Sequence, residues 1–482
     1  MRARICPRPV VVVLFAFCIG CATPPPAPVL SPEAGAAALA ARRLDDPRLL
    51  AFIDAAERLD PGQADPAGGG DKAAGPPPWT LRRLTLAALY FHPDLDVARS
   101  ALALAEAGKV TAGERPNPSL AFVPPPFLFG GVVNAVIETG GKRSARLANA
   151  AARAEAARED LITAGWQVRG GVRDAMAALW AARERGTRLA AEAAAQRKLA
   201  AAEEARLAAG AASAVEVSTA RIAATTLTTA LADNARAEAL AEAKLASAIG
   251  IPVAALRAVP LDFDRLATPP TLPADLAEGR LRRAALIGRS DVKSQLASYA
   301  AAQAALREQL ANRYPNLVLS PGYNWYQGIN TYALAPGFDL PILNQNQGRI
   351  GEALARRNQE AARFLALQAR IIAALDQAGA DYRASVASER EAEALLDAEA
   401  AHADAVARAF RAGASDQPAL LASEAALAHA RLARLDAHLT TLTAIGELED
   451  ALRQPLFDPG ARVPDLVAPP RAELAGAESP AR

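Results

Sequence analysis

One stretch of this chain alternates between apolar and polar side chains, whereas most of the rest follows the pattern of alanine-rich helices. The stretch runs from Arg313 to Ala353. Successive strand side chains point to opposite faces, so this period of two predicts a strand, a turn at Gly328-Ile329-Asn330 and a return strand. One parity of the first arm holds Leu317, Leu319, Tyr323 and Trp325, and one face of the return arm holds Tyr332, Leu334, Phe338 and Leu340.

The length and aromatic content of these arms are typical of a membrane-spanning hairpin. A tilted transmembrane strand needs about 10 residues, and aromatic side chains favour the membrane interface. An ordinary hairpin of a soluble sheet is the alternative, because barrel strands give only a weak sequence pattern. The candidate barrel aromatics are Tyr323, Trp325, Tyr326, Tyr332 and Phe338.

A long helix is predicted between Gly141 and Gly210, where the sequence has neither a proline nor a turn cluster. Its 69 steps (210 − 141) correspond to about 100 Å at ~1.5 Å per residue. Apolar and small residues recur every seven positions in two rows, which favours a helix packed on both sides, as in a wall of coiled coils. The first row is Leu161, Val168, Ala175, Ala182 and Leu189, and the second is Val172, Leu179, Gly186 and Ala193.

The chain contains an internal two-fold repeat. Asp94 matches Asp291 at an offset of 197 (291 − 94), and the turn glycines Gly210 and Gly413 match at an offset of 203 (413 − 210). Between these pairs, a strand-to-helix motif aligns Gly141 with Gly348 at an offset of 207 (348 − 141). Each repeat is therefore predicted to form a helix, a β-hairpin, a long helix, a turn and a helix. The residues of the strand-to-helix motif are Gly140, Gly141, Lys142 and Arg143 in the first repeat and Gly348 and Arg349 in the second.

The domain boundaries follow from the repeat. Repeat 1 spans residues 79–255, with a hairpin at about 119–138. Repeat 2 spans residues 276–455, with a hairpin at about 316–341. A proline-containing linker, 256–275, joins the two repeats, and residues 456–482 are predicted to form a disordered tail.

The N-terminus resembles a bacterial lipoprotein signal. Arginines precede an apolar run from Val10 to Ile19, which is too short to span a membrane as a helix, and a small residue precedes Cys21, the predicted lipidation site. The signal peptide is then 1–20, and residues 21–78 form a lipidated, Pro- and Gly-rich segment that contains a short helix within Glu33 to Leu59. A plain secretory signal cleaved nearby is the alternative. Cleavage before Cys21 leaves one cysteine, so no disulfide framework or thiolate metal site is expected.

Charge and motifs argue against nucleic-acid binding and catalysis. The chain has 53 basic and 52 acidic side chains, so it lacks a basic footprint for nucleic acid. The GGKRS stretch at Gly140–Ser144 resembles a phosphate loop, but Val136 stands where its first glycine belongs. No catalytic constellation stands out, so we expect no enzyme activity, cofactor or bound metal. The histidines form no metal motif and are expected at the surface: His92, His402, His429 and His438.

Four strands cannot span a membrane alone, because an open sheet leaves backbone N–H and C=O groups unpaired in hydrocarbon. Other copies of the chain must close the edges, so a membrane-spanning sheet here requires an oligomer.

Together, the repeat, the lipoprotein signal at Cys21 and the hairpins resemble the TolC-type outer-membrane factors of bacterial export systems. The resemblance covers about Trp79 to Pro455. The motifs IETGGKRSAR and FDLPILNQNQGRIGEA look like those of the CzcC-like branch, which serves heavy-metal cation pumps, although Ile137-Glu138 replaces a common Pro-Leu-type pair. The resemblance implies a mainly α fold with a membrane β-barrel contribution, in which a trimer forms a 12-stranded barrel and a periplasmic helical barrel. It also implies outer-membrane localisation, a periplasmic adaptor and an inner-membrane transporter of the proton-driven RND type.

The expected function is passive conduction of solutes, heavy-metal cations first among them, from the periplasm to the outside. Alternatives are a multidrug or type I secretion channel of the same fold and, from another class, a periplasmic adaptor or coiled-coil scaffold. An adaptor would be expected to carry a compact lipoyl-like module, for which no Gly- and Val-rich segment is present.

The turn after Gly413 is the candidate periplasmic gate. TolC-like channels place aspartate rings six and nine residues past this glycine, but Ala419 and Ala422 stand there. The nearby acids are Asp416 and Glu424, either of which could form an acidic ring that attracts cations. The alternative is that Asp416 only caps the helix begun by Pro418.

Overall fold

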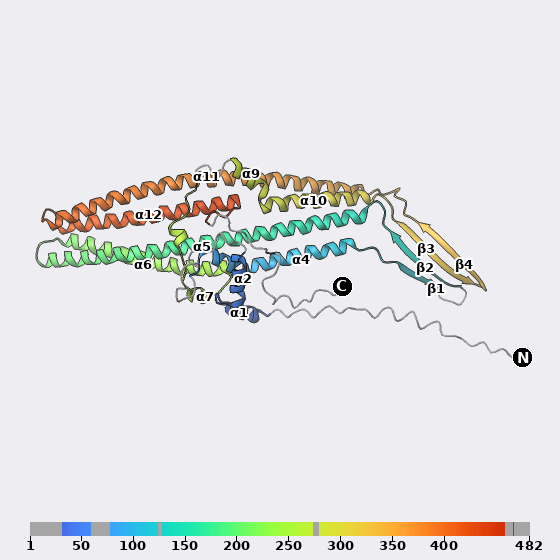
Figure 1. Ribbon diagram of the computed structural model, residues 1–482, viewed down its shortest axis with the longest axis horizontal. Coiled ribbons are helices and arrows are strands. Elements are labelled where there is room, and N and C mark those ends of the chain that lie inside the picture. The colour runs from blue at the N-terminus through green and yellow to red at the C-terminus, as the bar shows by residue number, and fades with distance from the viewer. Residues whose placement is uncertain (1–30, 59–77, 124–127, 273–278, 458–465, 467–482) are drawn as a thin grey trace. The chain divides into compact units, whose positions relative to one another are not determined.

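The computed structural model describes residues 31–58, 78–123, 128–272, 279–457 and 466 (Figure 1). The chain divides into two units, Met1–Ala41 with Arg471–Arg482, and Arg42–Pro470. In the first unit, the described helix is α1 (Pro32–Ala40), which Ser31 caps by accepting a hydrogen bond from the Ala34 backbone N–H. The predicted signal peptide and Cys21 lie outside the described residues.

Within the described part of Glu33 to Leu59, where the sequence predicts a short helix, the structure has two helices. α1 ends at Ala40, and a separate helix, α2 (Pro47–Arg58), begins six residues after Ala41. Pro47 favours a first helical position because it has no N–H to lose, and it disfavours helical backbone at the residue before it. Asp46 accepts a hydrogen bond from the Arg48 N–H at 2.8 Å and so caps this new start.

The Arg42–Pro470 unit repeats one succession of elements, which confirms the prediction of a mainly helical fold with a small sheet. Its long helices α5 and α11 each run from the sheet to a distant turn (Figure 1). In the first half the order is α3 (Leu81–Phe91), α4 (Pro93–Gly113), β1 (Ser119–Val123), β2 (Leu128–Ile137), α5 (Lys142–Ala208) and α6 (Ala214–Ile249). In the second it is α9 (Gly279–Gly288), α10 (Ser290–Ala311), β3 (Leu317–Tyr326), β4 (Ile329–Gly337), α11 (Gln347–Arg411) and α12 (Gln417–Leu452).

The two seven-residue rows of α5 explain its central place. This 67-residue helix packs against α4, α6, α10 and α12, so both of its sides need small or apolar residues. Leu161, Val168, Ala175, Ala182 and Leu189 of the first row are all buried, as are Val172, Leu179 and Ala193 of the second. Gly186 in the second row lies where a Cβ would come 2.9 Å from Asn234 Nδ2 of α6, so glycine allows this close approach.

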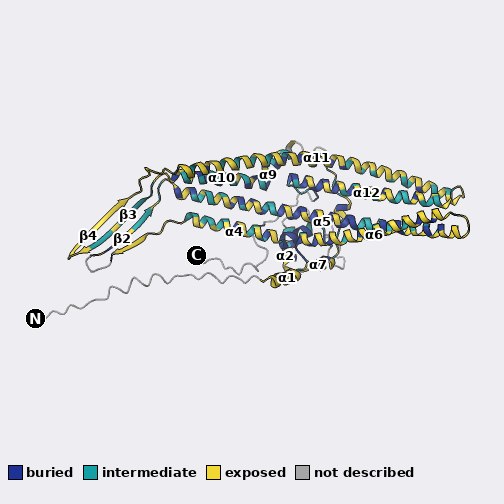
Figure 2. Ribbon diagram, turned by 180° about the vertical axis from the view of Figure 1, so that it is seen from behind, coloured by how far each residue is buried: buried dark blue, intermediate teal, exposed yellow. Residues whose placement is uncertain are grey.

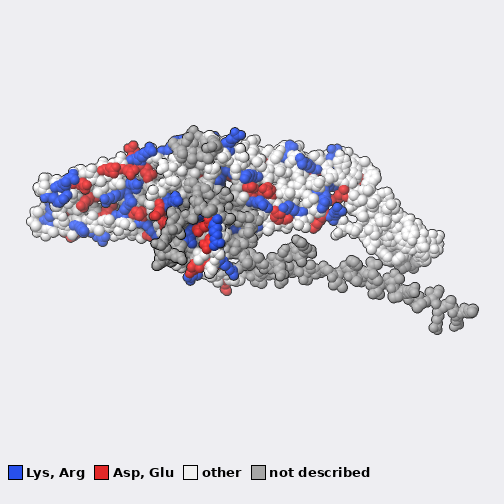
Figure 3. Space-filling model, in the orientation of Figure 1, with Lys and Arg blue, Asp and Glu red and all other residues white. Residues whose placement is uncertain are grey.

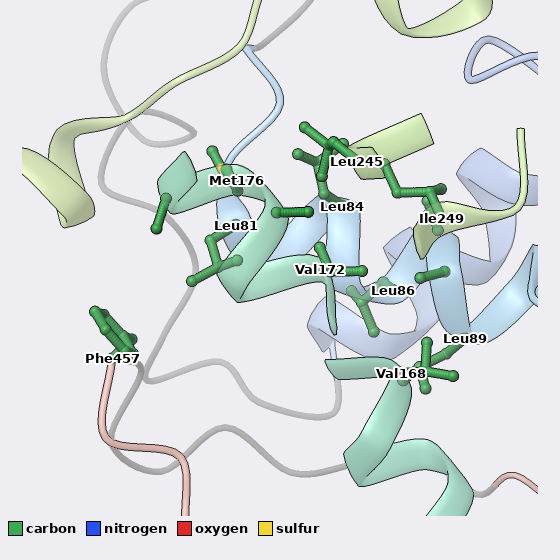
Figure 4. Packing of buried hydrophobic residues seen from close by; sticks show 14 of the residues in the cluster. Leu81, Leu84, Leu86, Leu89, Val168, Val172, Met176, Leu245, Ile249 and Phe457 are labelled. Atoms are coloured by element: carbon green, nitrogen blue, oxygen red, sulfur yellow. The ribbon is translucent and has the colours of Figure 1, made fainter. Parts of the chain in front are cut away.

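The middle of the unit holds the largest side-chain core. Buried residues gather where α2, α3 and α5 lie together (Figure 2). Figure 4 shows Val168, Val172 and Met176 of α5 beside leucines of α3 and beside Leu245 and Ile249 of α6. Aliphatic burial of this kind stabilises the helix packing in proportion to the apolar area removed from water.

The segment between the repeats is packed onto the helices. It forms α7 (Val253–Arg257) and α8 (Asp264–Ala267), with Leu256 and Leu266 buried. His438 of α12 is only 4% exposed beneath this segment, which corrects the prediction of a surface histidine. Its Nε2 lies 2.9 Å from the Leu266 carbonyl oxygen, and its Nδ1 lies 2.6 Å from Glu389 Oε1. The covering segment is distant in sequence, so helix periodicity alone does not reveal it.

The predicted tail also enters the core at its start. Leu456, Phe457 and Leu466 are all buried, which corrects the prediction of disorder at these three positions. Gly165 packs closely on Leu466, where a Cβ would come 2.6 Å from the leucine Cδ1.

A buried ion network ties this C-terminal segment to the helices. Glu449 is fully buried, and its Oε1 accepts hydrogen bonds from Arg169 at 3.0 Å and Arg173 at 3.1 Å. Its Oε2 accepts the backbone N–H groups of Leu456 at 2.6 Å and Phe457 at 3.3 Å. Burial by itself would raise the pKa of Glu449, but the two arginines and these hydrogen bonds hold the pKa below its ordinary value.

The sheet has four antiparallel strands in the order β1-β2-β3-β4, so each repeat contributes one hairpin. β2 and β3 pair at the centre, with Ile137 opposite Leu317, and β1 and β4 are the edges. Tyr326 pairs with Ile329, so the second turn consists of Gln327 and Gly328. Both have positive φ, 48° and 85°, as a two-residue type I′ turn requires. The predicted turn at Gly328-Ile329-Asn330 therefore begins one residue too late and ends two residues too late.

Replacing Glu449 by alanine is expected to destabilise the fold by about 3–5 kcal/mol, because it leaves buried arginines and backbone N–H groups without their shared acceptor. The wild-type contribution should be complete above the ordinary carboxylate pKa of 4.5 and should decline as the pH falls toward the lowered folded-state pKa. Thermal unfolding followed by circular dichroism at several pH values measures both effects.

The matched control is Glu393→Ala. Glu393 forms an exposed pair with Arg434 at 4.0 Å, so its removal should cost about 0–1 kcal/mol. Equal losses in the two variants would show that the Glu449 network does not stabilise the fold.

Candidate functional site

The two faces of the sheet differ in chemistry, because polar side chains gather on one of them. The register places on one face, in lateral rows, Phe129 beside Trp325, Gly131 beside Tyr323 and Ala135 beside Leu319. β4 continues this face with Tyr332 opposite Tyr323 and Leu334 opposite Pro321. We call it the apolar face. The opposite face carries the polar residues Asn134, Ser320, Asn324 and Thr331 together with glycines, alanines and the apolar residues Leu128, Val132, Val136, Val318 and Ile329, and we call it the polar face after these polar side chains.

The predicted barrel aromatics fall mainly on the apolar face. Tyr323, Trp325 and Tyr332 share it, and Tyr323 and Tyr332 have ring centroids 5.4 Å apart. Tyr326 lies on the opposite face, next to the turn. Phe338 lies beyond the end of β4 at Gly337, which corrects the predicted extent of the return strand, and Leu340 does too. The last pair of the two strands is Gly337 opposite Val318.

The strands carry no charged side chain. The sequence from Ser119 to Ile137 and from Leu317 to Gly337 contains no Asp, Glu, Lys or Arg. Figure 3 shows this end of the unit without acidic or basic atoms on the visible face. Burying an isolated charge in hydrocarbon is costly, so the composition suits a membrane. Charges begin directly after β2, where Glu138 pairs with Arg146.

The strand-to-helix motif of the first repeat is an anchor between the repeats. Gly140 and Gly141 have φ of 67° and 76°, so the chain turns sharply before α5 at positions where glycine is favoured. The turn directs Lys142 into a buried position, where its Nζ donates to the Tyr314 carbonyl oxygen at 2.7 Å and to Asn316 Oδ1. Burial lowers the pKa of Lys142, and the negative charge of Glu138 opposes that shift.

Arg143 has a different partner from Lys142. Its Nε donates to the Gly113 carbonyl oxygen at 2.7 Å, which fixes the end of α4 against the start of α5. The motif therefore connects the start of α5 with the end of α4 and with the segment between α10 and β3, which is a structural role. This geometry gives no support to the phosphate-loop interpretation.

The second copy of the motif aligns differently from the sequence-based pairing. Gly141 precedes α5 with positive φ, and the residue in that position before α11 is Asn346, with φ 66°. The structural offset is 205 (346 − 141), so the pairing of Gly141 with Gly348 is shifted by two residues. Gly348 and Arg349 lie in the first turn of α11. Asn346 tolerates this backbone because Asn adopts the left-handed region more readily than most residues, and its Nδ2 donates to the Gln309 carbonyl oxygen at 2.8 Å.

The turn glycines close both long helices in the same way. After α5, the Ala211 N–H donates to the Arg206 carbonyl and the Gly210 N–H to the Leu207 carbonyl. After α11, Ala414 and Gly413 donate in the corresponding pattern. This is the Schellman arrangement, in which the left-handed residue is usually glycine; Gly210 has φ 71° and Gly413 has φ 73°.

Asp416 caps α12, as the alternative to the acidic-ring hypothesis predicts. Its Oδ1 accepts the Ala419 N–H at 2.9 Å, and Pro418 occupies the first turn. Glu424 lies exposed two turns into the same helix. These acids lie far from the sheet, since the 65 residues of α11 span about 98 Å at ~1.5 Å per residue. A cap does not remove the carboxylate charge, so the acidic-ring hypothesis stays open.

Among the described residues, no group of three or more histidine, cysteine or acidic side chains could hold a metal ion. Across the same residues, the helices lack an apolar stretch of the length needed to cross a membrane.

No family model and no curated protein matches the sequence, but solved structures match the fold. A membrane protein from Pseudomonas aeruginosa superposes with a TM-score of 0.66 and 18% identity, covering 77% of this chain and 93% of that one. The outer-membrane channel OprN gives a TM-score of 0.64 and 18% identity, covering 77% and 89%. The outer membrane protein VceC from Vibrio cholerae gives 0.64 and 18%, covering 77% and 95%.

The chain therefore has the fold of outer-membrane channel proteins. The similarity extends over most of the length of those structures.

Replacing Lys142 by methionine is expected to lower stability by about 1–3 kcal/mol, because the Tyr314 carbonyl and the Asn316 side chain lose their buried donor. Lys109→Met is the control, since Lys109 is a partly exposed residue paired with Glu106 on its own helix. Thermal unfolding of the purified variants measures the difference, and unchanged stability of Lys142→Met would contradict the anchoring role.

Proposed function

We propose that the chain is one subunit of an outer-membrane export channel. One observation carries the proposal: the long helices end in a charge-free sheet with one apolar face and two unpaired edges. Three copies of the four-stranded sheet would give 12 strands (3 × 4), enough to close a barrel whose apolar face contacts lipid. The fold of OprN, which is an outer-membrane channel, supports this function.

Closure through neighbouring copies follows from hydrogen bonding. β1 and β4 are the sheet edges, and in hydrocarbon each unpaired backbone group costs several kcal/mol. In the proposed trimer, β4 of one copy pairs with β1 of the next. The flanking helices support the same contact, because α4 exposes Val97 and Leu104 and α11 exposes Leu365. A neighbouring copy would cover these side chains.

The helices would form the periplasmic part of the channel. α5 extends about 100 Å from the sheet at ~1.5 Å per residue for its 67 residues. The turns after Gly210 and Gly413 would then lie at the inner end, where a periplasmic adaptor and an RND-type inner-membrane transporter deliver the solute. The energy for transport comes from that transporter, and the channel itself has no enzymatic role.

Heavy-metal cations are the proposed cargo, on the strength of the motifs after the two hairpins. A multidrug or type I secretion channel of the same fold is the second candidate. The two differ in what the inner end selects, because cation export favours an acidic entrance. Asp416 and Glu424 are the acids available near the second turn, and three-fold symmetry would repeat each as a ring.

The first test of this function concerns membrane insertion. Leu319→Asp should abolish insertion and trimer formation, because it places a charge on the apolar face in lipid. Ser320→Asp, one residue along the same strand, should preserve both, because Ser320 lies on the opposite face. Membrane fractionation and the oligomeric state in detergent give the result; equal behaviour of the two variants would refute the assignment of the faces.

The same membranes test the proposed lipid anchor. Labelled palmitate should enter the parental protein and not Cys21→Ser, while the unlabelled variant should stay in the outer membrane because the barrel also holds it. Full labelling of Cys21→Ser would show that the lipid is elsewhere.

The second test concerns the inner entrance. If an acidic ring attracts cations, Asp416→Asn or Glu424→Gln should lower the ratio of cation to anion permeability in single-channel recordings. Asp416→Asn retains a good helix cap, so a loss of selectivity cannot be assigned to loss of the cap. Unchanged ratios in both variants would leave Asp416 as a cap and place any selection elsewhere.

A further inference from the structure

The polar face of the sheet carries a hydrogen-bonded ladder that crosses three strands. Asn134 of β2 lies at its centre: its Nδ2 donates to Ser119 Oγ of β1 at 3.4 Å, and its Oδ1 accepts from Ser320 Oγ of β3 at 2.8 Å. The three side chains therefore form one lateral row from the edge strand inward. Each keeps further hydrogen-bonding capacity, since an amide and two hydroxyl groups have more donor and acceptor sites than this row uses.

A second row lies closer to the turn. Asn324 of β3 pairs with Gly130 of β2 and Thr331 of β4. Gly130 is required at this place, because a Cβ there would collide with Asn324 Oδ1 and with the Tyr323 carbonyl oxygen. The amide of Asn324 thus lies over the backbone of the neighbouring strand, where a larger residue would displace it.

We propose that these two rows form an uncharged belt of amide and hydroxyl groups on the inner wall of the channel. This inference rests on the proposed function, and it specifies which solutes the sheet admits. The amide and hydroxyl groups of the belt donate and accept hydrogen bonds as water does, and they carry no fixed charge. The belt therefore passes hydrated cations, anions and neutral hydrophilic solutes alike, and discrimination by charge belongs to the helical part.

The absence of charge is what separates such a belt from a selective filter. Charge-selective pores use rings of acidic or basic side chains, whose repeated charge attracts one sign of ion and repels the other. Both hairpins lack ionisable acidic and basic residues, whereas such residues resume at Glu138 and Lys142 directly below β2. Aspartate has nearly the same shape as asparagine. Replacing an asparagine of the belt by aspartate would therefore convert the uncharged belt into a charged ring.

The test compares two asparagine-to-aspartate substitutions on opposite faces. Asn134→Asp adds a carboxylate to the belt, and Asn330→Asp adds one to the apolar face. Asn330 pairs with Trp325 beside the turn, at the end of the hairpin, where a charge on this face costs far less than at Leu319 in the middle of the strand. In planar bilayers under a potassium chloride gradient, Asn134→Asp should raise the potassium-to-chloride permeability ratio roughly fivefold, the factor given by about 1 kcal/mol of attraction between unit charges about 4 Å apart in water. Asn330→Asp should leave the ratio unchanged. Ser320→Asp tests the same row if Asn134→Asp fails to insert.

Single cysteines provide an independent measurement. The sequence has no cysteine after Cys21, so Ser320→Cys and Leu319→Cys each introduce the only one in the body. A cationic, membrane-impermeant thiol reagent should reduce the conductance of Ser320→Cys and leave Leu319→Cys unaffected.

The outcomes separate the belt from the channel function. A conducting parental protein with no change in Asn134→Asp or Ser320→Asp, or with reaction at Leu319→Cys instead of Ser320→Cys, would overturn the belt and leave the channel standing. A parental protein that inserts as a trimer without conducting would overturn both.

Discussion

The completion of backbone hydrogen bonds is the constraint on which the rest of this structure depends. A four-stranded sheet leaves the outer sides of β1 and β4 unpaired. Water can satisfy such groups, but hydrocarbon cannot. A charge-free sheet with an apolar face is therefore stable in a membrane only when neighbouring copies complete its edges.

A second constraint is that the long helices must pack closely against one another along most of their length. α5 contacts helices on two sides along most of its 67 residues, and alanine and glycine allow backbones to come near without a thick core. Large side chains are concentrated where α2 packs on α3 and α3 packs on α5. The helical wall is thus thin and regular along its length, with one thick region stabilised by aliphatic burial and by the network around Glu449.

Periodicity and the internal repeat made the main elements predictable from the sequence. The seven-residue rows of α5 identified its buried positions, and the alternation after Arg313 identified the apolar face that contains Tyr323 and Trp325.

The predictions were less accurate at the ends of helices and strands and where a distant segment covers a side chain. Positive φ at Gln327 and Gly328 places the turn one residue before the predicted start, and positive φ at Asn346 shifts the motif alignment by two residues. The burial of His438 and the anchoring of Lys142 depend on segments remote in sequence, which no local pattern contains. The ladder through Asn134 depends on strand register, which requires the pairing of two repeats.

The Glu449 network has a consequence for how the chain reaches its folded state. Arg169 belongs to the first repeat and meets an acceptor 280 positions later, and that acceptor binds the backbone of Leu456 and Phe457. Contacts so distant in sequence carry a large loop-closure entropy, which slows folding. The contact of α5 with Glu449 therefore cannot form until almost the entire polypeptide has been synthesised. Under the proposed outer-membrane function this delay would be useful, since a polypeptide that cannot complete its core early remains extended enough to be carried across the inner membrane.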